Sequence, residues 1–170
     1  MIIFETERLL VRYLRDDDFD AFYSLCNDPE VMQYMGDGKP LTAEQTRGWI
    51  KTSQENYQKQ GFGCFALTFR QDGQLLGFGG LVYPHSSSQV EIIYAFKPSY
   101  WGRGLAGEFV RAMIKTGFER WQLPRIEASI DPRNPASIKA VQRIGMVFVH
   151  SGVDETNQPT LFYALNRPPR

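Results

Sequence analysis

Apolar and polar residues alternate along several short segments of the chain, which is the spacing of a half-buried β-strand. A loose alternation predicts a first strand over 8–14. Three further segments, 64–70, 75–83 and 90–96, lie between turn-forming residues and predict an antiparallel meander. Asp72-Gly73, between the first two of them, is a strong hairpin signal. Segments of the same kind predict three later strands, over 125–130, 146–150 and 161–165.

A helical spacing replaces the alternation in four places. Over 105–121 an apolar residue recurs at every fourth position with charged residues opposite, which predicts a long amphipathic helix. A capping box predicts a helix over 42–60, and Asn followed by Pro begins a short one over 134–144. Three aspartates form the acidic first turn of a helix over 16–26, an interpretation preferred to a metal-binding cluster, and 27–30 breaks it. The order predicts an α/β (α+β) fold, with a mixed, mostly antiparallel sheet of about seven strands flanked by about four helices.

Composition narrows the class of protein. The chain has 170 residues, with 19 Lys and Arg against 19 Asp and Glu, and we expect it to form one domain over residues 1–170. The balanced charge removes the main electrostatic argument for a nucleic-acid or membrane partner. No apolar run approaches the roughly 18 residues that span a bilayer. The two cysteines form no Cys-x-x-Cys pair, and Cys64 is expected to be a small buried side chain. We therefore expect a cytoplasmic protein that binds neither nucleic acid nor membranes.

The segment between the strand 90–96 and the long helix carries the strongest chemical signal. It reads Lys97-Pro98-Ser99-Tyr100-Trp101-Gly102-Arg103-Gly104-Leu105-Ala106, so a proline ends the strand and two glycines precede the helix. The start of a helix offers unpaired N–H groups and partial positive charge, and glycine allows an anion to approach the backbone closely. A plain strand-to-helix turn needs only one glycine. We therefore interpret this segment as a phosphate-binding turn.

Gly102, Gly104 and Gly107 also match the dinucleotide fingerprint Gly-x-Gly-x-x-Gly, and Glu127 lies about 20 residues further on. The context argues against a dinucleotide fold, because the preceding strands form an antiparallel meander and five residues separate Phe96 from Gly102. Too little chain follows for the parallel sheet that such a fold needs. A dinucleotide-dependent oxidoreductase is therefore the less favoured alternative.

The run from Glu91 to Ala106 resembles the acetyl-CoA site of the GCN5-related N-acetyltransferases (GNAT), and most closely the branch of the ribosomal-protein-alanine N-acetyltransferases. The resemblance covers nearly the whole chain. Residues 7–12 resemble the opening strand of that branch, and 27–32 resemble its loop after the first helix. Asn134-x-x-Ser137 followed by Gly145-Met146 resembles its second cofactor motif.

The resemblance implies a GNAT-like sheet that splays between 90–96 and 125–130, with acetyl-CoA as co-substrate entering there and the acceptor approaching from 32–38 and the final hairpin. In the family, backbone groups at the end of the fourth strand hold the pantetheine arm, and the following turn binds the pyrophosphate. The implied cofactor-binding residues are Phe96, Lys97, Gly102, Arg103, Gly104, Leu105, Ala106, Asn134 and, as a weaker candidate for a phosphate, Arg143.

The chain departs from the family pattern at two positions. Trp101 stands where the fuller motif begins with Gln or Arg, and we expect it to pack, because its indole cannot mimic the charge of an arginine. Val141 stands where many relatives have a tyrosine as general acid, so the thiolate must leave by another route and Ser137 is the nearest substitute. An attacking amine must lose a proton, and Glu91 is our candidate base; a solvated edge carboxylate is the equally weighted alternative. Tyr94 is expected in the core rather than as an acid.

The predicted activity is acetyl-CoA-dependent acetylation of a primary amine by direct attack in a ternary complex, because no protein nucleophile is evident. No paired histidines suggest a metal site, and His150 is more typical of a structural residue than of the acceptor cleft. The acceptor is the amine of a protein N-terminus or of a small molecule, and we leave a homodimer open. A CoA-binding sensor or interaction module without turnover is the alternative from a different class.

Overall fold

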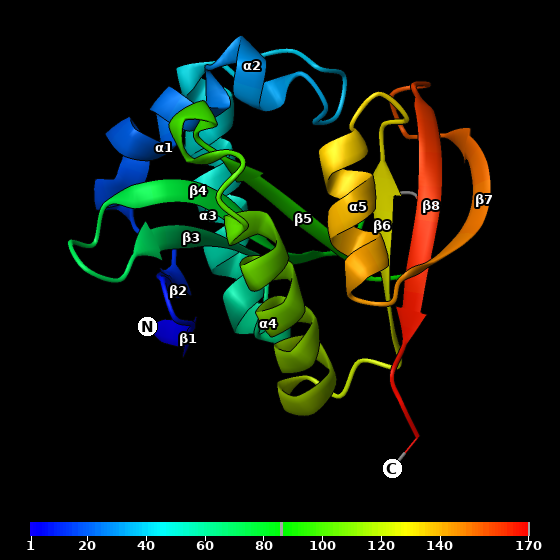
Figure 1. Cartoon of the computed structure of the whole chain (residues 1–170). Coiled ribbons are helices and arrows are strands. Elements are labelled where there is room, and N and C mark those ends of the chain that lie inside the picture. The colour runs from blue at the N-terminus through cyan, green and yellow to red at the C-terminus, as the bar shows by residue number, and fades with distance from the viewer. Residues whose placement is uncertain (86, 170) are drawn as a thin grey trace.

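The computed structural model describes residues 1–85 and 87–169 (Figure 1). Eight strands of these residues form one sheet in the order β1-β2-β3-β4-β5-β6-β8-β7. The strands are β1 (Ile2–Glu5), β2 (Leu9–Tyr13), β3 (Cys64–Phe69), β4 (Leu75–Val82), β5 (Glu91–Phe96), β6 (Arg125–Ile130), β7 (Val147–Val153) and β8 (Pro159–Asn166). The helices are α1 (Phe19–Cys26), α2 (Pro29–Met32), α3 (Ala43–Gln60), α4 (Leu105–Arg120) and α5 (Pro135–Arg143), with short 3-10 turns η1 (Asp16–Asp18) and η2 (Pro98–Tyr100).

The topology of the sheet follows from the lengths of its connections. β1 to β5 form an antiparallel meander, in which each strand pairs with the one before it in the chain. β5 and β6 are parallel, and α4 is the crossover between them, as parallel strands require. β6 then pairs with β8 and β8 with β7, both antiparallel. The mixed, mostly antiparallel sheet that the sequence predicts is therefore confirmed.

Helices cover both faces of the sheet. α4 and α5 lie on one face, with α1 and α3 on the other (Figure 1). The α4 face holds the larger core cluster, in which Phe109 and Met113 are fully buried. The α1 and α3 face holds a second cluster around Phe22 and Phe78. The alternation in β5 divides its side chains between these clusters: Ile92, Tyr94 and Phe96 face the first, and Ile93 and Ala95 pack against the second.

Two elements are additional to those predicted. β1 is only four residues long, so its alternation is too short to recognise, and its pairing with β2 defines it. The predicted break at 27–30 contains the start of α2, where the Asp28 carboxylate accepts a hydrogen bond from Glu30 N. The three aspartates form η1, and the helix proper begins one residue later, at Phe19.

Candidate active site

The predicted phosphate-binding turn connects β5 to α4. Pro98 begins η2, and the chain then passes through Gly102 and Gly104, whose φ angles are +71° and +76°. Residues with a β-carbon rarely adopt this left-handed conformation, so glycine is required at both positions. Gly104 is the N-cap of α4 and has no side chain to satisfy the first N–H groups of the helix. The first turn of α4 therefore presents free donors to an anion.

A brace from Arg8, the residue before β2, holds this turn in place. Arg8 contacts Glu108, in the first turn of α4, through its Nε and Nη2 atoms at 2.7 Å, and its Nη1 donates to the carbonyl of Arg103 at 2.7 Å. Burial alone would raise the pKa of Glu108, but hydrogen bonds from Thr6 and Arg8 hold that pKa below its ordinary value. The brace thus keeps a carboxylate ionised beside the turn and ties the turn to the sheet.

Trp101 caps the end of β5. Its indole Nε1 donates to the carbonyl of Phe96 at 2.8 Å, while 45% of the residue surface stays exposed. The residue that departs from the family pattern therefore fixes the geometry of the turn. It does so by a hydrogen bond from its indole to the backbone. This bond carries no charge, so Trp101 does not replace the positive charge that an arginine would bring.

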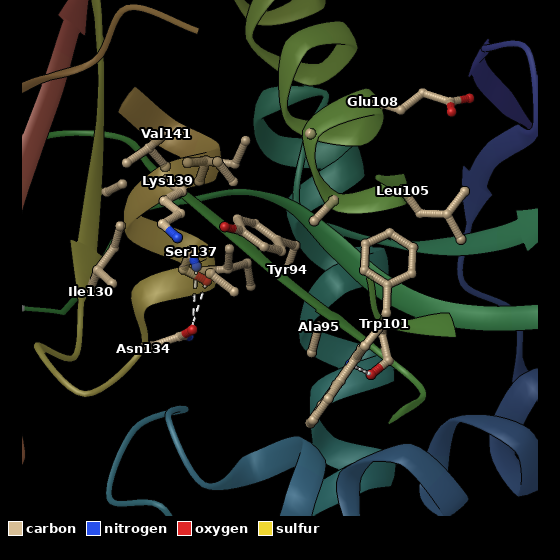
Figure 2. A pocket seen from close by; sticks show the side chains of 18 of the residues that line it. Tyr94, Ala95, Trp101, Leu105, Glu108, Ile130, Asn134, Ser137, Lys139 and Val141 are labelled. Atoms are coloured by element: carbon tan, nitrogen blue, oxygen red, sulfur yellow. Dashed lines mark hydrogen bonds between the residues drawn. The ribbon is translucent and has the colours of Figure 1, made fainter. Parts of the chain in front are cut away.

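β5 and β6 separate after one paired position. Only Glu91 and Glu127 are in register, and Glu127 N donates to Val90 O at 2.8 Å. Beyond this pair the strands diverge, and a cavity of about 1250 Å³ fills the opening and extends along α4 and α5. Figure 2 shows side chains of these two helices and of β5 around the cavity. The splay that the sequence predicts is confirmed.

The backbone of β5 exposes hydrogen-bonding groups to this opening. Lys97 N donates to Leu76 O at 2.8 Å, so Lys97 directs its backbone towards β4. In an antiparallel ladder these directions alternate. Ile92, Tyr94 and Phe96 therefore direct their N–H and C=O groups away from β4 and towards the side of β6.

Most of the predicted cofactor-binding residues line the cavity. Those that do are Phe96, Gly102, Gly104, Leu105, Ala106, Asn134 and Arg143. Lys97 and Arg103 are not among the lining residues, and the Arg103 guanidinium lies 5.2 Å from the centre of the Tyr100 ring. Sequence reasoning did not select Arg111, Lys115 and Lys139, which also line the cavity. With Arg143 they give its α4 and α5 walls a basic character, which suits a phosphorylated ligand.

The start of α5 brings Asn134 and Ser137 together. The Asn134 Oδ1 accepts from Ser137 N at 3.3 Å and caps the helix, while its Nδ2 donates to the Ser137 hydroxyl at 3.0 Å. Ser137 lines the cavity. Val141, one turn later on the same helix, is fully buried and also borders the cavity.

Glu91 lies at the paired end of the opening and is half-buried. It is not among the residues that line the cavity, and its carboxylate accepts a hydrogen bond from the Ser129 hydroxyl on β6. Burial raises the pKa of Glu91, and the negative charges of Glu127, Glu155 and Asp154 add to that shift. Ser129 opposes it by donating to the ionised form.

Tyr94 was expected in the core, and the structure also places it at the wall of the cavity. Its ring packs against Phe109 at a centroid distance of 6.2 Å, in agreement with that expectation. Its hydroxyl, however, is buried without a hydrogen-bond partner among the described residues, and the side chain lines the cavity. A tyrosine that faces a helix much later in the chain leaves no local pattern, which is why sequence reasoning assigned it to the core alone.

The cavity also borders α2 and the loop after it. Val31, Gln33, Tyr34 and Met35 line this part. The turn between β7 and β8 reaches the same loop, where the Thr156 hydroxyl donates to Gly36 O at 3.3 Å. His150, on β7, is exposed and stacks on Phe162 instead of lining the cavity.

Comparison with known proteins agrees with this geometry. Residues 8–147 match the family described as acetyltransferase (GNAT) domain. The chain belongs to the GNAT acetyltransferase family. YkkB of Bacillus subtilis (strain 168), an uncharacterized protein, is 34% identical over 161 residues, which cover 93% of this chain and 92% of YkkB. YnaD of the same organism, an uncharacterized N-acetyltransferase, is 30% identical over 142 residues, covering 83% and 80%.

A solved structure of a GNAT-family acetyltransferase from Bacillus anthracis superposes with a TM-score of 0.82 at 26% identity and covers 98% of this chain and 99% of that one. This GNAT chain is therefore an N-acetyltransferase of a family whose enzymes use acetyl-CoA, which argues against the dinucleotide-dependent alternative. Among the described residues no group of three or more His, Cys, Asp or Glu side chains is arranged to hold a metal ion. Within the same residues no helix is long and apolar enough to cross a membrane.

Proposed function

We propose that residues 1–170 act as one N-acetyltransferase domain that acetylates a primary amine, on a protein N-terminus or a small molecule, by direct attack in a ternary complex. The observation that carries the proposal is the opening between β5 and β6, which has the free N–H groups of α4 near one end and the half-buried Glu91 carboxylate beside the other. Two reactants that meet in one cavity need no covalent acyl-enzyme.

The residues around the opening fit acetyl-CoA. The backbone groups of Ile92, Tyr94 and Phe96 that face away from β4 are spaced to pair with an extended pantetheine arm, as an added strand would. Phe96 offers its N–H group, because its carbonyl already accepts from Trp101. Lys97, whose N–H is bonded within the sheet, contributes less than the resemblance implies.

The turn from Gly102 to Ala106 fits the pyrophosphate. Its two left-handed glycines leave room for an anion at the first turn of α4, since a β-carbon at Gly104 would have only the Arg8 guanidinium within 4 Å, at 3.6 Å. CoA carries one phosphate besides the pyrophosphate. Its charge is matched by the basic residues of the cavity wall, Arg111, Lys115, Lys139 and Arg143. Arg103 contributes its backbone to the turn, and its side chain remains beside Tyr100.

Glu91 is the proposed general base. A carboxylate with a raised pKa takes up a proton more readily than an ordinary glutamate, and that suits the removal of a proton from an amine. Glu91 lies outside the cavity lining, so we propose that a water molecule connects it to the amine. Ser137 is the proposed donor to the departing sulfur, because it borders the cavity at the start of α5 where Val141 offers no proton.

A thiol-release assay with a panel of amines tests the proposed function. The panel contains N-terminal peptides, amino acids, polyamines and aminoglycosides. Acetyl-CoA is the acetyl donor, and mass spectrometry identifies the product. We expect release of CoA that depends on at least one amine and yields its acetylated form. Binding of CoA without acetylation of any amine would instead support a CoA-binding sensor.

A further inference from the structure

The departing thiolate needs a proton source, and the serine hydroxyl by itself is a poor one. A serine alkoxide is far more basic than a thiolate, whose parent thiol has a pKa of about 8.5. Ser137 can therefore give up its proton only if a more acidic group replaces it at the same time. Val141, which stands at the position of the family tyrosine, cannot provide that group.

Tyr94 is such a group, because a phenol is a far stronger acid than an alcohol, and it lines the same cavity as Ser137. Its hydroxyl points from β5 across to α5, where Ser137 lies (Figure 2). Burial raises the pKa of Tyr94, so its hydroxyl is protonated at neutral pH, and that hydroxyl has no hydrogen-bond partner among the described residues. A buried hydroxyl without a partner is unfavourable, so its retention here calls for an explanation.

Ser137 can accept this partner. Its hydroxyl oxygen already accepts from Asn134 Nδ2 at 3.0 Å and keeps a second lone pair for Tyr94. When Tyr94 donates to this lone pair as well, the serine proton points away from both donors and into the cavity. Tyr94 thus both orients the serine proton and can replace it.

We propose that Tyr94 is a positioning residue and proton source that acts through Ser137 in the acetyl transfer. This inference rests on the proposed function. As the amine nitrogen bonds to the acyl carbon and the carbon–sulfur bond breaks, the electron pair of that bond goes to sulfur. Ser137 gives its proton to the sulfur and takes the proton of Tyr94. The tyrosinate regains a proton through Ser137, which borders the cavity, after CoA has left, and the amine proton leaves through Glu91.

Tyr94→Phe is the decisive variant, because it removes the hydroxyl and keeps the ring against Phe109. We expect kcat to fall by about 100-fold with an unchanged KM for acetyl-CoA. We expect the Tm to stay equal or rise, because the lost hydroxyl has no partner. Tyr57→Phe is the matched control: its hydroxyl is buried and bonded to Leu14 N and Cys64 O, so the control should lower Tm and leave kcat unchanged.

Two further measurements separate action through Ser137 from other roles. In a double-mutant cycle, Tyr94→Phe should cost nothing further once Ser137 is alanine, and additive effects would overturn the proposal. Without any turnover, wild type should bind CoA more tightly than desulfo-CoA, and this preference should shrink in Tyr94→Phe and Ser137→Ala alike. If Tyr94→Phe retains the full preference or the full kcat, the proposal is wrong.

Lys139 is the competing proton source, since its side chain extends into the same region (Figure 2). If Lys139→Met reproduces the loss of kcat and Tyr94→Phe does not, the lysine supplies the proton and the proposal is overturned. A wild-type protein that acetylates no amine would refute the proposed function alone, because the comparison of CoA with desulfo-CoA would still test the link from Tyr94 to the sulfur.

Discussion

At the residue scale, Glu91 is a carboxylate whose pKa depends on its surroundings. Burial and three neighbouring carboxylates raise that pKa, so the folded protein binds the Glu91 proton more tightly than the unfolded chain does. The contribution of this group to stability is therefore fully present below the unfolded pKa of about 4.3 and is lost as pH rises through the higher folded pKa. At neutral pH the ionised Glu91 lowers the free energy of unfolding.

Glu91→Gln should consequently separate activity from stability. We expect kcat to fall by about 100- to 10,000-fold if Glu91 takes the amine proton. The free energy of unfolding at pH 7 should stay equal or increase, because a neutral amide avoids the cost of a buried charge. Rates measured across pH, together with denaturant melts at pH 4 and pH 7, check both parts. Unchanged rates at every pH, with chemistry limiting, would return Glu91 to a structural role.

At the element scale, the first turn of α4 depends on contacts from elsewhere in the chain. Its N-cap is a glycine that forms no side-chain cap, and the turn is anchored instead by Arg8, which bonds to the Glu108 carboxylate and to the Arg103 carbonyl. A capping side chain would itself occupy the donors at the helix start. The combination of an uncapped helix and a remote brace leaves those donors free for a ligand.

Gly104→Val tests whether this turn binds the pyrophosphate. Valine would be strained at a φ of +76°, at a cost of roughly 1–2 kcal/mol in stability, and its side chain would project where the anion approaches. We expect the affinity for CoA to fall about tenfold or more, equivalent to about 1.4 kcal/mol. Calorimetric titration with CoA measures the loss.

Gly73→Val is the control for backbone strain. Gly73 has a φ of +71°, lies in the exposed turn before β4, and does not line the cavity. It should lose similar stability and bind CoA normally. Normal CoA binding by folded Gly104→Val would show that the pyrophosphate lies elsewhere.

At the scale of the whole molecule, a ligand seated between β5 and β6 would join the two parts of a sheet that one paired position connects. Binding to the folded state alone stabilises by about 2.7 kcal/mol when the ligand is present at one hundred times its Kd. For a chain of this length that corresponds to a rise in Tm of roughly 5–10 °C.

Acetyl-CoA should therefore raise the Tm by this amount, and NAD at the same concentration should not. The reason is that the opening accepts an extended arm along β5, whereas NAD lacks a pantetheine group to pair there. Differential scanning fluorimetry with both ligands makes the comparison. A larger shift with NAD would contradict the assignment of the cavity to acetyl-CoA.

Much of this molecule is determined by local sequence. The four-residue spacing of apolar side chains defines α4 to within one residue of its predicted end, because that spacing repeats over more than four turns. The glycines before α4 predict the turn, because glycine is the residue that adopts a left-handed backbone without steric cost. The alternation in β5 likewise predicts which of its side chains face α4.

Tertiary structure alone decided the features that depend on residues far apart in the chain. Arg8 reaches Glu108 across 100 positions, and Tyr94 faces Ser137 from a different element. Neither pair leaves a periodic or local signal, because the contact exists only after α4 has crossed the sheet and α5 has packed beside it. The separation of β5 from β6 has the same origin: each strand alternates normally, and only the crossover geometry determines where their pairing ends and the cavity begins.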